Sequence, residues 1–498
     1  MYNAIKLHDQ DNVSVASMQI PANVKINDTL ISKDDIPFGH KIALTEIKKN
    51  SYIYKYGQII GIASKDILRG EHVHSHNLAF TEFERSIEIK KRKKTLLDDL
   101  ETIYFDGFKR KNKKFGTRNY IGLLSTVNCS ATVVKKIAES INNNSELKKY
   151  KNIDGAVCLK HSSGCGMNTN GYGMNIFNQT IEGFKNHPNF VKVFVVGLGC
   201  ECAQISLYKD NNESVVYMNI QDEGGTKKII NKVSSQIIEL LPDLNKQERV
   251  KIPISELTVA LQCGGSDGYS GITANPALGY ASDLIVKHGG STILSETPEI
   301  YGAEHLLIER AENNEIVKKL KKQIKWWQHY TSINDGSLDN NPSPGNKKGG
   351  LTTILEKSLG AVAKSGTSVM HDVLYYGEPL KKKGFNYMDS PGYDPVSVTG
   401  QVASGSNIIC FTTGRGSCFG FKPTPSIKIS TNTNMFNKLI EDMDINAGTI
   451  MDGEADIEKI GKKIFQSIIE TASGKLTKSE INGYGDDEFN PWVIGATM

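Results

Sequence analysis

Residues 261–277 read LQCGGSDGYSGITANPA and follow directly on the apolar run Leu257-Thr-Val-Ala-Leu261. That run has the length and composition of a buried strand. It opens into a turn that combines glycines with a thiol, a hydroxyl and a carboxylate, at Cys263, Ser266 and Asp267. Glycine lets the backbone approach a ligand or adopt a positive φ. Because no packing requirement demands so polar a strand end, we expect this turn to form one wall of an active site.

Strand-like segments that end in glycine turns recur from Gly116 onward. They alternate with helix-prone segments, which is the pattern of an α/β fold with a parallel sheet. The main predicted strands are residues 120–124, 155–159, 191–196, 258–262, 291–294 and 408–412, and the main predicted helices are residues 131–142, 226–241 and 303–322.

The 498 residues of the chain exceed one ordinary hydrophobic core, so several domains are expected. The N-terminal part has short strand-like segments separated by glycine and proline turns, which predicts a small, mostly β domain. A lysine-rich stretch follows it, and a second break lies near Pro242 to Pro253. The expected parts are a β domain at 1–85, a charged linker at 86–115, and two α/β catalytic lobes at 116–250 and 251–498.

The net charge of +4 is small for this length, and the most basic segment is Lys90-Lys-Arg-Lys-Lys94. No nucleic-acid-binding motif accompanies that segment, so we interpret it as a solvated linker and expect no nucleic-acid partner. The N-terminus has no signal-peptide pattern, and no apolar run reaches the roughly 18 residues of a membrane span. Eight cysteines are too few for a disulfide scaffold, which predicts a cytoplasmic protein with free thiols.

Four of these cysteines lie just after predicted strands or in glycine turns: Cys129, Cys165, Cys200 and Cys263. Thiolates held in this way bind iron, zinc or an iron–sulfur cluster. Their spacing fits no CxxC pattern, and small buried cysteines that simply suit tight turns remain the competing interpretation.

The segment Glu71-His-Val-His-Ser-His76 places His72, His74 and His76 at alternate positions. On an extended segment such residues share one face, where three imidazoles could bind Fe²⁺, Mn²⁺ or Zn²⁺. A solvated hydrophilic edge explains the pattern equally well.

Several ionisable residues also follow strands or glycine turns. Asp267 and Glu296 stand at strand ends, where α/β sheets place their ligands, and His161 stands beside Cys165. Other carboxylates suited to proton transfer are Glu299, Glu304, Glu356 and Asp394.

Two glycine turns could hold an anionic substrate. In residues 341–357, a Gly-Gly turn opens a helix at Thr352 and Thr353, with Lys347 nearby, which predicts an anion cradle suited to a carboxylate. In FTTGRGS, Arg415 could hold a carboxylate through two hydrogen bonds. An ordinary glycine loop with a solvated cation is the alternative for both.

Long motifs of this chain resemble the altronate and galactarate dehydratase family. They are GTRNYIGLLSTVNCSATV, GLGCE, QCGGSDGYSGITANPALGYASDL, SETPEIYGAEHLL, NPSPGNKKGGLTTILEKSLG, TTGRGS and DMDINAGTI. The resemblance covers nearly the whole chain, and its N-terminal part is similar to the small β-clip (SAF) domain of these enzymes. It implies a cytoplasmic hydro-lyase that uses Fe²⁺ or Mn²⁺ and forms 2-keto-3-deoxy sugar acids, and we expect a homo-oligomer, most simply a dimer.

The resemblance implies abstraction of the C2 proton and departure of the C3 hydroxyl. We assign the metal to His72, His74 and His76, with Cys129, Cys165, Cys200 and Cys263 as further candidate ligands. Substrate contacts are assigned to Ser266, Asp267, Asn346, Lys347 and Arg415. The base is left open among His161, Asp267 and Glu296.

Altronate is the first expected substrate, because HVHSHN resembles the altronate branch, and galactarate is the second. A sulfolactate sulfo-lyase is a lesser alternative, because its β-clip domain is a separate chain. Outside this family, the cysteines would also suit an iron–sulfur redox protein, and the scaffold would suit a non-catalytic sugar-acid sensor.

Overall fold

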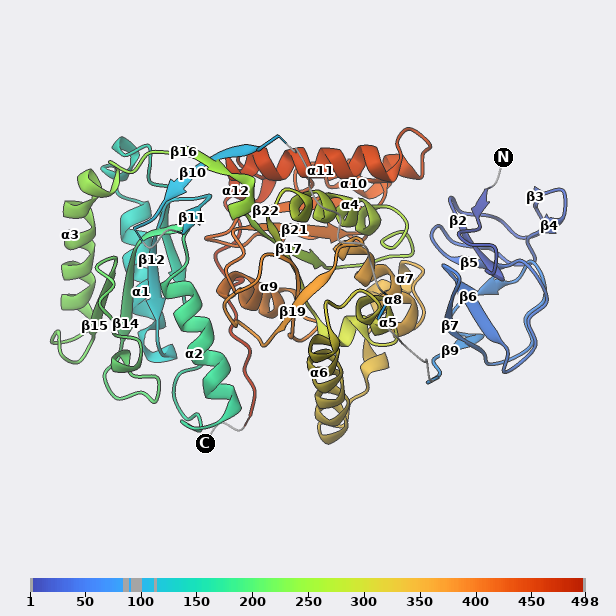
Figure 1. Ribbon diagram of the computed structural model, residues 1–498, viewed down its shortest axis with the longest axis horizontal. Helices are drawn as coiled ribbons and strands as arrows, with labels where there is room; N and C mark the ends of the chain where they lie inside the picture. Colours follow the sequence, from blue (N-terminus) through green and yellow to red (C-terminus); the bar gives the residue numbers. More distant parts are fainter. Residues whose placement is uncertain (1–2, 84–88, 91–100, 112–113, 496–498) are drawn as a thin grey trace.

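The computed structural model of the chain (Figure 1) describes residues 3–83, 89–90, 101–111 and 114–495. The N-terminal part is a small β domain, as the sequence predicts. One antiparallel sheet has the order β1(Ala4–Ile5), β2(Val13–Ala16), β5(Lys41–Ala43), β8(His72–Val73), and a second has the order β6(Tyr52–Lys55), β7(Gln58–Ala63), β9(Leu78–Ala79). A two-stranded sheet of β3(Lys25–Asn27) and β4(Leu30–Ile31) completes it.

The segment expected to be a charged linker contains a strand. Residues 104–109 form β10(Tyr104–Lys109), which pairs antiparallel with β11(Phe115–Gly116) and β16(Val250–Pro253). Phe105 and Phe108 are buried there, so apolar burial outweighs the local lysine content. The expected linker residues 86–88, 91–100 and 112–113 lie outside the described residues.

The first α/β region is built on a four-stranded parallel sheet. Its order is β13(Gly155–Leu159), β12(Tyr120–Ser125), β14(Phe190–Gly197), β15(Val215–Asn219). Helices α1(Asn128–Asn142) and α3(Thr226–Leu244) share one hydrophobic core against this sheet. Helix α2(Tyr172–Lys185) belongs to a different core, which it shares with α9(Asp394–Ala403) of the C-terminal region.

The C-terminal region is built on a seven-stranded parallel sheet. Its order is β19(Met370–Leu374), β20(Gly384–Met388), β18(Ser291–Leu294), β17(Thr258–Cys263), β21(Ile408–Thr413), β22(Ser426–Ser430), β23(Ile445–Asn446). The remaining helices are α4(Ala274–Lys287), α5(Glu304–Ile308), α6(Asn314–Ile333), α7(Pro344–Lys348), α8(Ile354–Val362), α10(Thr433–Lys438), α11(Ile457–Ala472) and α12(Lys478–Ile481).

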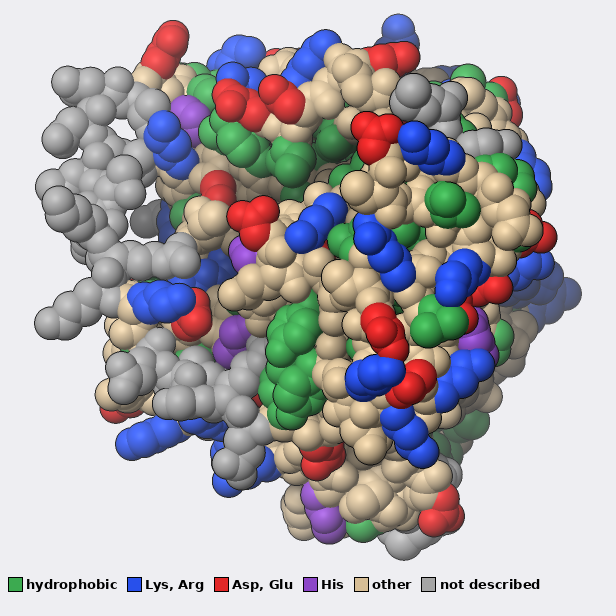
Figure 2. All heavy atoms as spheres, turned by 90° about the vertical axis from the view of Figure 1, so that its right-hand side faces the viewer, with side chains coloured by type: hydrophobic (Ala, Val, Ile, Leu, Met, Phe, Trp, Pro, Cys, Tyr) green, Lys and Arg blue, Asp and Glu red, His purple; other side chains and the backbone are tan. Residues whose placement is uncertain are grey.

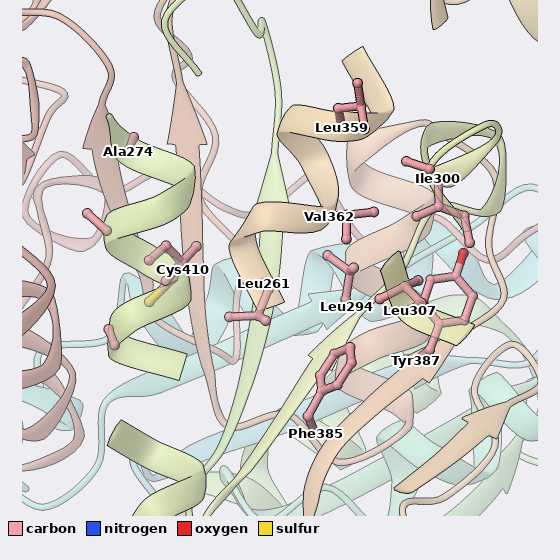
Figure 3. Close-up of a cluster of buried hydrophobic side chains, with 14 of the residues drawn as sticks. Leu261, Ala274, Leu294, Ile300, Leu307, Leu359, Val362, Phe385, Tyr387 and Cys410 are labelled. Carbon is pink, nitrogen blue, oxygen red and sulfur yellow. The ribbon is translucent and has the colours of Figure 1, made fainter. Parts of the chain in front are cut away.

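The core under this sheet explains why its strands read as continuous apolar runs. Leu261 of β17, Leu294 of β18 and Phe385 of β20 are at most 1% exposed and point toward the helices that cover the sheet (Figure 3). Strands buried on both faces need apolar residues at every position.

The six predicted strands are all present, two of them with the predicted limits, residues 155–159 and 291–294. The predicted helix 303–322 is instead two helices, α5 and α6, separated by residues 309–313. Asn313 ends the continuity, because its side chain caps α6 by accepting bonds from the Glu315 and Ile316 amides.

Buried lysines attach the N-terminal domain to the C-terminal region. Lys41 of β5 and Lys55 of β6 both donate to the carboxylate of Glu356 in α8, at 2.9 and 2.8 Å. All three side chains are at most 1% exposed. The lysines also donate to the carbonyls of Gly350 (2.7 Å) and Gly268 (3.3 Å), so they hold the two glycine loops as well.

Seen from the side of the N-terminal domain, acidic and basic side chains are interspersed over the described surface (Figure 2). This mixture differs from the basic stripe that binds nucleic acid. Among the described residues, none of the helices has the length and apolarity to cross a bilayer.

We predict that Glu356→Gln destabilises the native protein by about 3–5 kcal/mol, because two buried ammonium groups lose their counter-charge. Urea unfolding followed by fluorescence and circular dichroism measures the loss. Asp28→Asn, which removes an exposed ion pair with Lys25, is the control and should change stability by less than about 1 kcal/mol.

The same variant should change the response to acid. Burial acts to raise the pKa of Glu356, but Lys41 and Lys55 outweigh it and hold that pKa well below the ordinary value of 4.5. The stabilisation is therefore present above pH 4.5 and declines as the pH falls toward the lowered value. A wild-type and a Glu356→Gln protein with equal stability at pH 7 would contradict this role.

Candidate active site

The carboxyl ends of β17, β18 and β21 lie next to one another, because these strands are neighbours in a parallel sheet. The chain leaves β17 toward β18 on one side and later returns to β21 on the other, and such a switch point is where α/β sheets bind ligands. A cavity of about 400 Å³ opens at this edge. Its lining includes Cys263, Gly264, Gly265, Glu299, Asn341, Asn346, Lys357 and Asp394.

A buried ionic network forms one side of this cavity. Lys357 donates to Glu299 at 2.7 Å, and Asn341 donates to the same carboxylate oxygen at 2.8 Å. Burial acts to raise the pKa of Glu299, but Lys357 and Lys364 outweigh it and hold that pKa below its usual value. Glu299 is therefore an ionised carboxylate at neutral pH.

Cys263 joins this network through its sulfur, which lies 2.7 Å from the Lys364 ammonium and 3.8 Å from Glu299. Burial raises the pKa of the Cys263 thiol to about 11, although Lys364 opposes the shift. Burial acts to lower the pKa of Lys364, but Cys263 and the nearby glutamates overcome it, so Lys364 is charged.

Glu296 has a different environment although it is only three residues from Glu299. It follows β18 in the left-handed region, with φ of 76°, a conformation that non-glycine residues adopt at a cost in strain. Both of its carboxylate oxygens are buried, and neither has a hydrogen-bond partner. Burial, reinforced by Glu299, raises its pKa well above the usual value, which favours the protonated form.

Asp394 begins helix α9 and faces the cavity from the other side of β17. Its carboxylate lies so close to Gly264 that a side chain at that position would meet its Oδ2 at 2.1 Å. Burial, followed by repulsion from Glu299, raises the pKa of Asp394 to about 7. Carboxyl groups with well-separated pKa values in one cavity are the arrangement that acid–base enzymes use.

The charges of this network do not cancel at neutral pH. Lys357 and Lys364 are cationic, Glu299 is anionic, Glu296 is neutral, and Asp394 is about half ionised. The surplus is positive and is shielded from water, which favours an anionic ligand.

Asp267 is buried, and the protein itself satisfies its carboxylate. One oxygen accepts from the Tyr269 amide and the Ser270 hydroxyl, each at 3.1 Å. The other accepts from Thr431 at 2.9 Å and Asn432 at 3.2 Å. The structure therefore places Asp267 as a tie between the turns after β17 and β22.

Ser266 and Asn346, both predicted to bind substrate, contact each other. The Asn346 amide donates to the Ser266 carbonyl at 2.8 Å, and its oxygen accepts from Ser343 in a capping box that starts α7. Both residues are at most 4% exposed. Asn346 lines the cavity, but its polar atoms are used to join the two loops.

The predicted anion cradle is occupied by a carboxylate of the chain itself. Glu356 accepts from the Thr352 amide at 3.0 Å and from the Thr352 hydroxyl at 2.7 Å, and its own amide donates to the Thr353 hydroxyl. The occupant of this turn is thus an internal carboxylate, paired with Lys41 and Lys55.

Lys347 and Arg415 are the lysine and arginine that were predicted to bind substrate. Lys347 is partly exposed, and its carbonyl accepts from an imidazole of the N-terminal domain. Arg415 is exposed beside Gly265 and Gly349, where an added Cβ would lie 3.2 or 3.3 Å from its side-chain carbons. Arg415 thus stands at the rim of the turn that follows β17.

The predicted histidines lie where the N-terminal domain meets the loop at residues 347–348, together with His40, which the sequence analysis missed. His40 Nδ1 lies 3.0 Å from His72 Nε2, and the His72 ring is 5.5 Å from that of His74 and 5.2 Å from that of His76. His40 is unrecognisable in the sequence, because it reaches the others only through the pairing of β5 with β8.

The histidines of this cluster have the chemistry of metal ligands, although among the described residues no three of their ring nitrogens lie within 4.8 Å of one another. Burial lowers the pKa of His72 to about 3 and that of His74 to about 4, so both are neutral imidazoles. His40 Nε2 and His74 Nε2 contact the Lys348 and Lys347 carbonyls at 3.2 and 2.9 Å. Metal-binding histidines are oriented by such backbone contacts.

A second donor set is Cys263, Glu296 and Glu299, whose ligand atoms lie within 4.8 Å of one another. This set fits a cation poorly, because Lys364 and Lys357 already contact Cys263 and Glu299 at 2.7 Å. A metal ion would have to displace two buried ammonium groups or be repelled by them.

The structure places His161 and three of the predicted cysteines on the four-stranded sheet, apart from this cavity. His161 Nε2 contacts the Ser125 carbonyl at 2.8 Å, and its Nδ1 accepts from the Ser163 amide. Both ring nitrogens are used inside the fold. Cys129, Cys165 and Cys200 follow β12, β13 and β14 and are exposed.

The sequence analysis overlooked Lys357, which lines the cavity, and Lys364, which contacts the Cys263 sulfur. They stand seven residues apart, and the residues between them, SLGAVA, carry no charge. Two lysines that flank a short uncharged run are a signal that could have been noticed.

Three comparisons with known families agree along the chain. Residues 2–81 match the altronate/galactarate dehydratase SAF domain. Residues 107–245 match the second domain of D-galactarate dehydratase/altronate hydrolase, and residues 254–497 match the C-terminal domain of D-galactarate/altronate dehydratase.

Similar proteins align over almost their whole length. Galactarate dehydratase (L-threo-forming) of Escherichia coli is 39% identical over 95% of this chain and 93% of its own. Altronate dehydratase of Bacillus subtilis is 37% identical over 97% of this chain and 98% of its own. Altronate dehydratase of Escherichia coli is 36% identical over 96% and 97%.

We predict that Cys263 resists alkylation in the native protein. Its thiol is buried and protonated, whereas Cys418 is exposed, so iodoacetamide at pH 8 should modify Cys263 more than ~10-fold more slowly. Peptide mass spectrometry of timed samples measures both rates, and urea-unfolded protein is the control in which they should converge. Equal rates in the native protein would show that Cys263 is an accessible thiolate.

Proposed function

The chain belongs to the altronate and galactarate dehydratase family, and from this premise we propose that it is a hydro-lyase that converts a sugar acid to its 2-keto-3-deoxy acid. The observation that carries the proposal is the cavity at the ends of β17 and β18. An ionised carboxylate, Glu299, and a carboxyl group that titrates near pH 7, Asp394, line it together with Lys357, and the buried carboxyl group of Glu296 lies behind this lining, within 4.8 Å of Glu299 and Cys263. In this proposal the regions built on the two parallel sheets are the two catalytic lobes.

Dehydration of a 2,3-dihydroxy acid needs one group that accepts the C2 proton and one that protonates the departing C3 hydroxyl. Asp394 suits the first role, because a pKa of about 7 leaves it ionised often enough to act and basic enough to take a proton. Glu296 suits the second, because it stays protonated at neutral pH and directly adjoins Cys263 and Glu299.

The proton and the hydroxyl group that leave the substrate are accounted for by Asp394, Glu296 and water, so no further reagent is needed. The carboxylate of Asp394 takes the proton from C2, the C2–C3 double bond forms, and the C3 hydroxyl leaves as water with the proton of Glu296. The enol then tautomerises to the 2-keto acid. Lys357 lies on the cavity wall, where it stabilises the negative charge that develops on the substrate carboxylate in the first step.

We further propose that His40, His72, His74 and His76 hold the divalent metal expected for this family, Fe²⁺ or Mn²⁺. Bound there, the metal would supply Lewis-acid stabilisation of substrate oxygens. The histidines contact the carbonyls of Lys347 and Lys348, which adjoin Asn346 on the cavity wall. The N-terminal domain would thus contribute directly to the active site.

D-Altronate is the substrate that we place first. Among the described residues that line the cavity, Lys357 is the single lysine or arginine, which matches an acid with one carboxylate. Galactarate has two carboxylates and would need a second cation, for which Arg415 at the rim is the candidate. The similarity to both named enzymes leaves galactarate as the second choice.

We predict turnover of D-altronate to a 2-keto-3-deoxy acid when the full-length protein is purified anaerobically with Fe²⁺ or Mn²⁺. A panel of aldonic and aldaric acids, assayed for 2-keto-3-deoxy products, tests this. Turnover of galactarate but not altronate would overturn the substrate choice and retain the reaction class. Absence of product from every sugar acid would overturn both.

We predict that Asp394→Asn lowers kcat by about 10²–10⁴-fold, the usual contribution of a general base. In the wild-type enzyme, kcat/KM should rise with pH and level off above about 7, because the base must lose its proton. This limb should disappear in the variant. Asp372→Asn, which removes a carboxylate bound to Lys319 in the same sheet, is the control and should keep the wild-type profile. An unchanged profile in Asp394→Asn would contradict the assignment.

A further inference from the structure

Three exposed cysteines stand at the switch point of the other parallel sheet. In its order β13-β12-β14-β15, the chain leaves β12 for β13 on one side and returns to β14 on the other. Cys129 lies in the first turn of α1 after β12, Cys165 follows β13, and Cys200 follows β14. The carboxyl ends of strands at a switch point form a ready crevice for a ligand.

Backbone contacts bring the three cysteine loops together. The Asn128 amide, next to Cys129, donates to the Ser163 carbonyl at 3.0 Å, and the Ala203 amide donates to the Gly164 carbonyl at 3.1 Å. Gly164, next to Cys165, has φ of 98° and is pressed against Thr126 so closely that a Cβ would lie 2.1 Å from its carbonyl oxygen. The loop after β13 therefore lies between the loops after β12 and β14.

A buried carboxylate fixes the loop that carries Cys200. Glu201 is 3% exposed and accepts from the Thr126 hydroxyl at 2.7 Å and the Gly199 amide at 2.7 Å. Cys202 packs against the hydrophobic core, so it is separate from the exposed thiols. The side chain of Gln221, after β15, reaches the Cys200 sulfur at 3.6 Å.

Exposure of these thiols is unusual, because free cysteine is among the most buried residue types. Cys263 and Cys410, in the C-terminal region, follow that rule and are buried. Three exposed thiols on a rigid, converging frame indicate soft metal chemistry. The N-terminus of α1 beside Cys129 favours the negative charge of a thiolate-bound centre.

The positions of the three sulfurs argue against a single-ion centre. A single tetrahedral ion with metal–sulfur bonds of about 2.3 Å needs its sulfurs about 3.8 Å apart. The three sulfurs are not all within 4.8 Å of one another, since Cys263, Glu296 and Glu299 are the donor set that meets this limit among the described residues. An iron–sulfur cluster, which is several atoms wide, is the soft-metal centre that does not require this limit.

We propose that Cys129, Cys165 and Cys200 bind an iron–sulfur cluster at the carboxyl edge of the four-stranded sheet. Cys263, which the sequence analysis grouped with them, belongs to the lysine-paired network of the other sheet and is not a ligand. With three protein thiolates, one iron of a four-iron cluster has an open position for an oxygen ligand.

The test uses full-length protein purified anaerobically and reconstituted with equal amounts of ferric and ferrous iron and with sulfide. We expect about four iron and four acid-labile sulfide per chain, with broad absorption near 400 nm. Cys129→Ser, Cys165→Ser and Cys200→Ser should each lose at least half of the iron and sulfide. Cys418→Ser, which changes an exposed cysteine that follows β21 of the other parallel sheet, is the matched control and should retain both.

Each of the following outcomes supports or overturns the proposal without an activity assay. One metal ion per chain without sulfide would replace the cluster with a single-ion site. Equal iron and sulfide in the three variants and in wild type would overturn the site, as would loss of the cluster in Cys263→Ser alone. Circular dichroism of each variant confirms that it is folded, and alkylation of the three thiols in metal-free protein, blocked after reconstitution, tests the ligands without any substitution.

Discussion

Lys41 and Lys55 of the N-terminal domain share one buried carboxylate, that of Glu356, and the arrangement of both glycine loops depends on this contact. Three charges in a site without water are stable only when each is paired and hydrogen-bonded. Here Thr352, Gly350 and Gly268 complete the pairing. The small β domain is thereby fixed against the loops at residues 264–270 and 346–353, and its histidines meet the carbonyls of the second loop.

The buried charged groups of the candidate active site are subject to the same requirement for pairing and hydrogen bonding, but their pairing is less complete. Around Glu356 both ammonium groups and the carboxylate have protein hydrogen-bond partners, whereas beside β17 both carboxylate oxygens of Glu296 lack one, and the pKa values of Glu296 and Glu299 shift in opposite directions. An incomplete pairing is costly for the folded protein alone, and an anionic ligand relieves the cost. The strained backbone of Glu296 is a further cost in stability of the kind found at functional sites.

Much of the fold could be predicted, because a buried parallel strand needs an apolar run and its end needs a glycine turn. The strands at 155–159 and 291–294 follow from that rule alone. Helix 303–322 was predicted as continuous because its break contains neither glycine nor proline. Cys263 and Glu296 were identifiable from their positions at strand ends, but Lys364 contacts Cys263 across 101 residues of sequence. Such a contact depends on how the turn at residues 363–365, just after α8, packs against the sheet, and His40 similarly depends on strand register, so local sequence could not reveal either.

The contact of Lys41 and Lys55 with Glu356 also bears on whether the protein could be made as two separate chains. Recognition between the β domain and the catalytic region lies in folded surfaces, with buried charges on both sides, and requires no peptide bond between them. The covalent connection then acts by raising the local concentration of one part near the other. Genes encoding the two parts as separate polypeptides would yield the same active-site geometry, provided that the two chains together retain Lys41, Lys55 and Glu356 and are made in sufficient amounts.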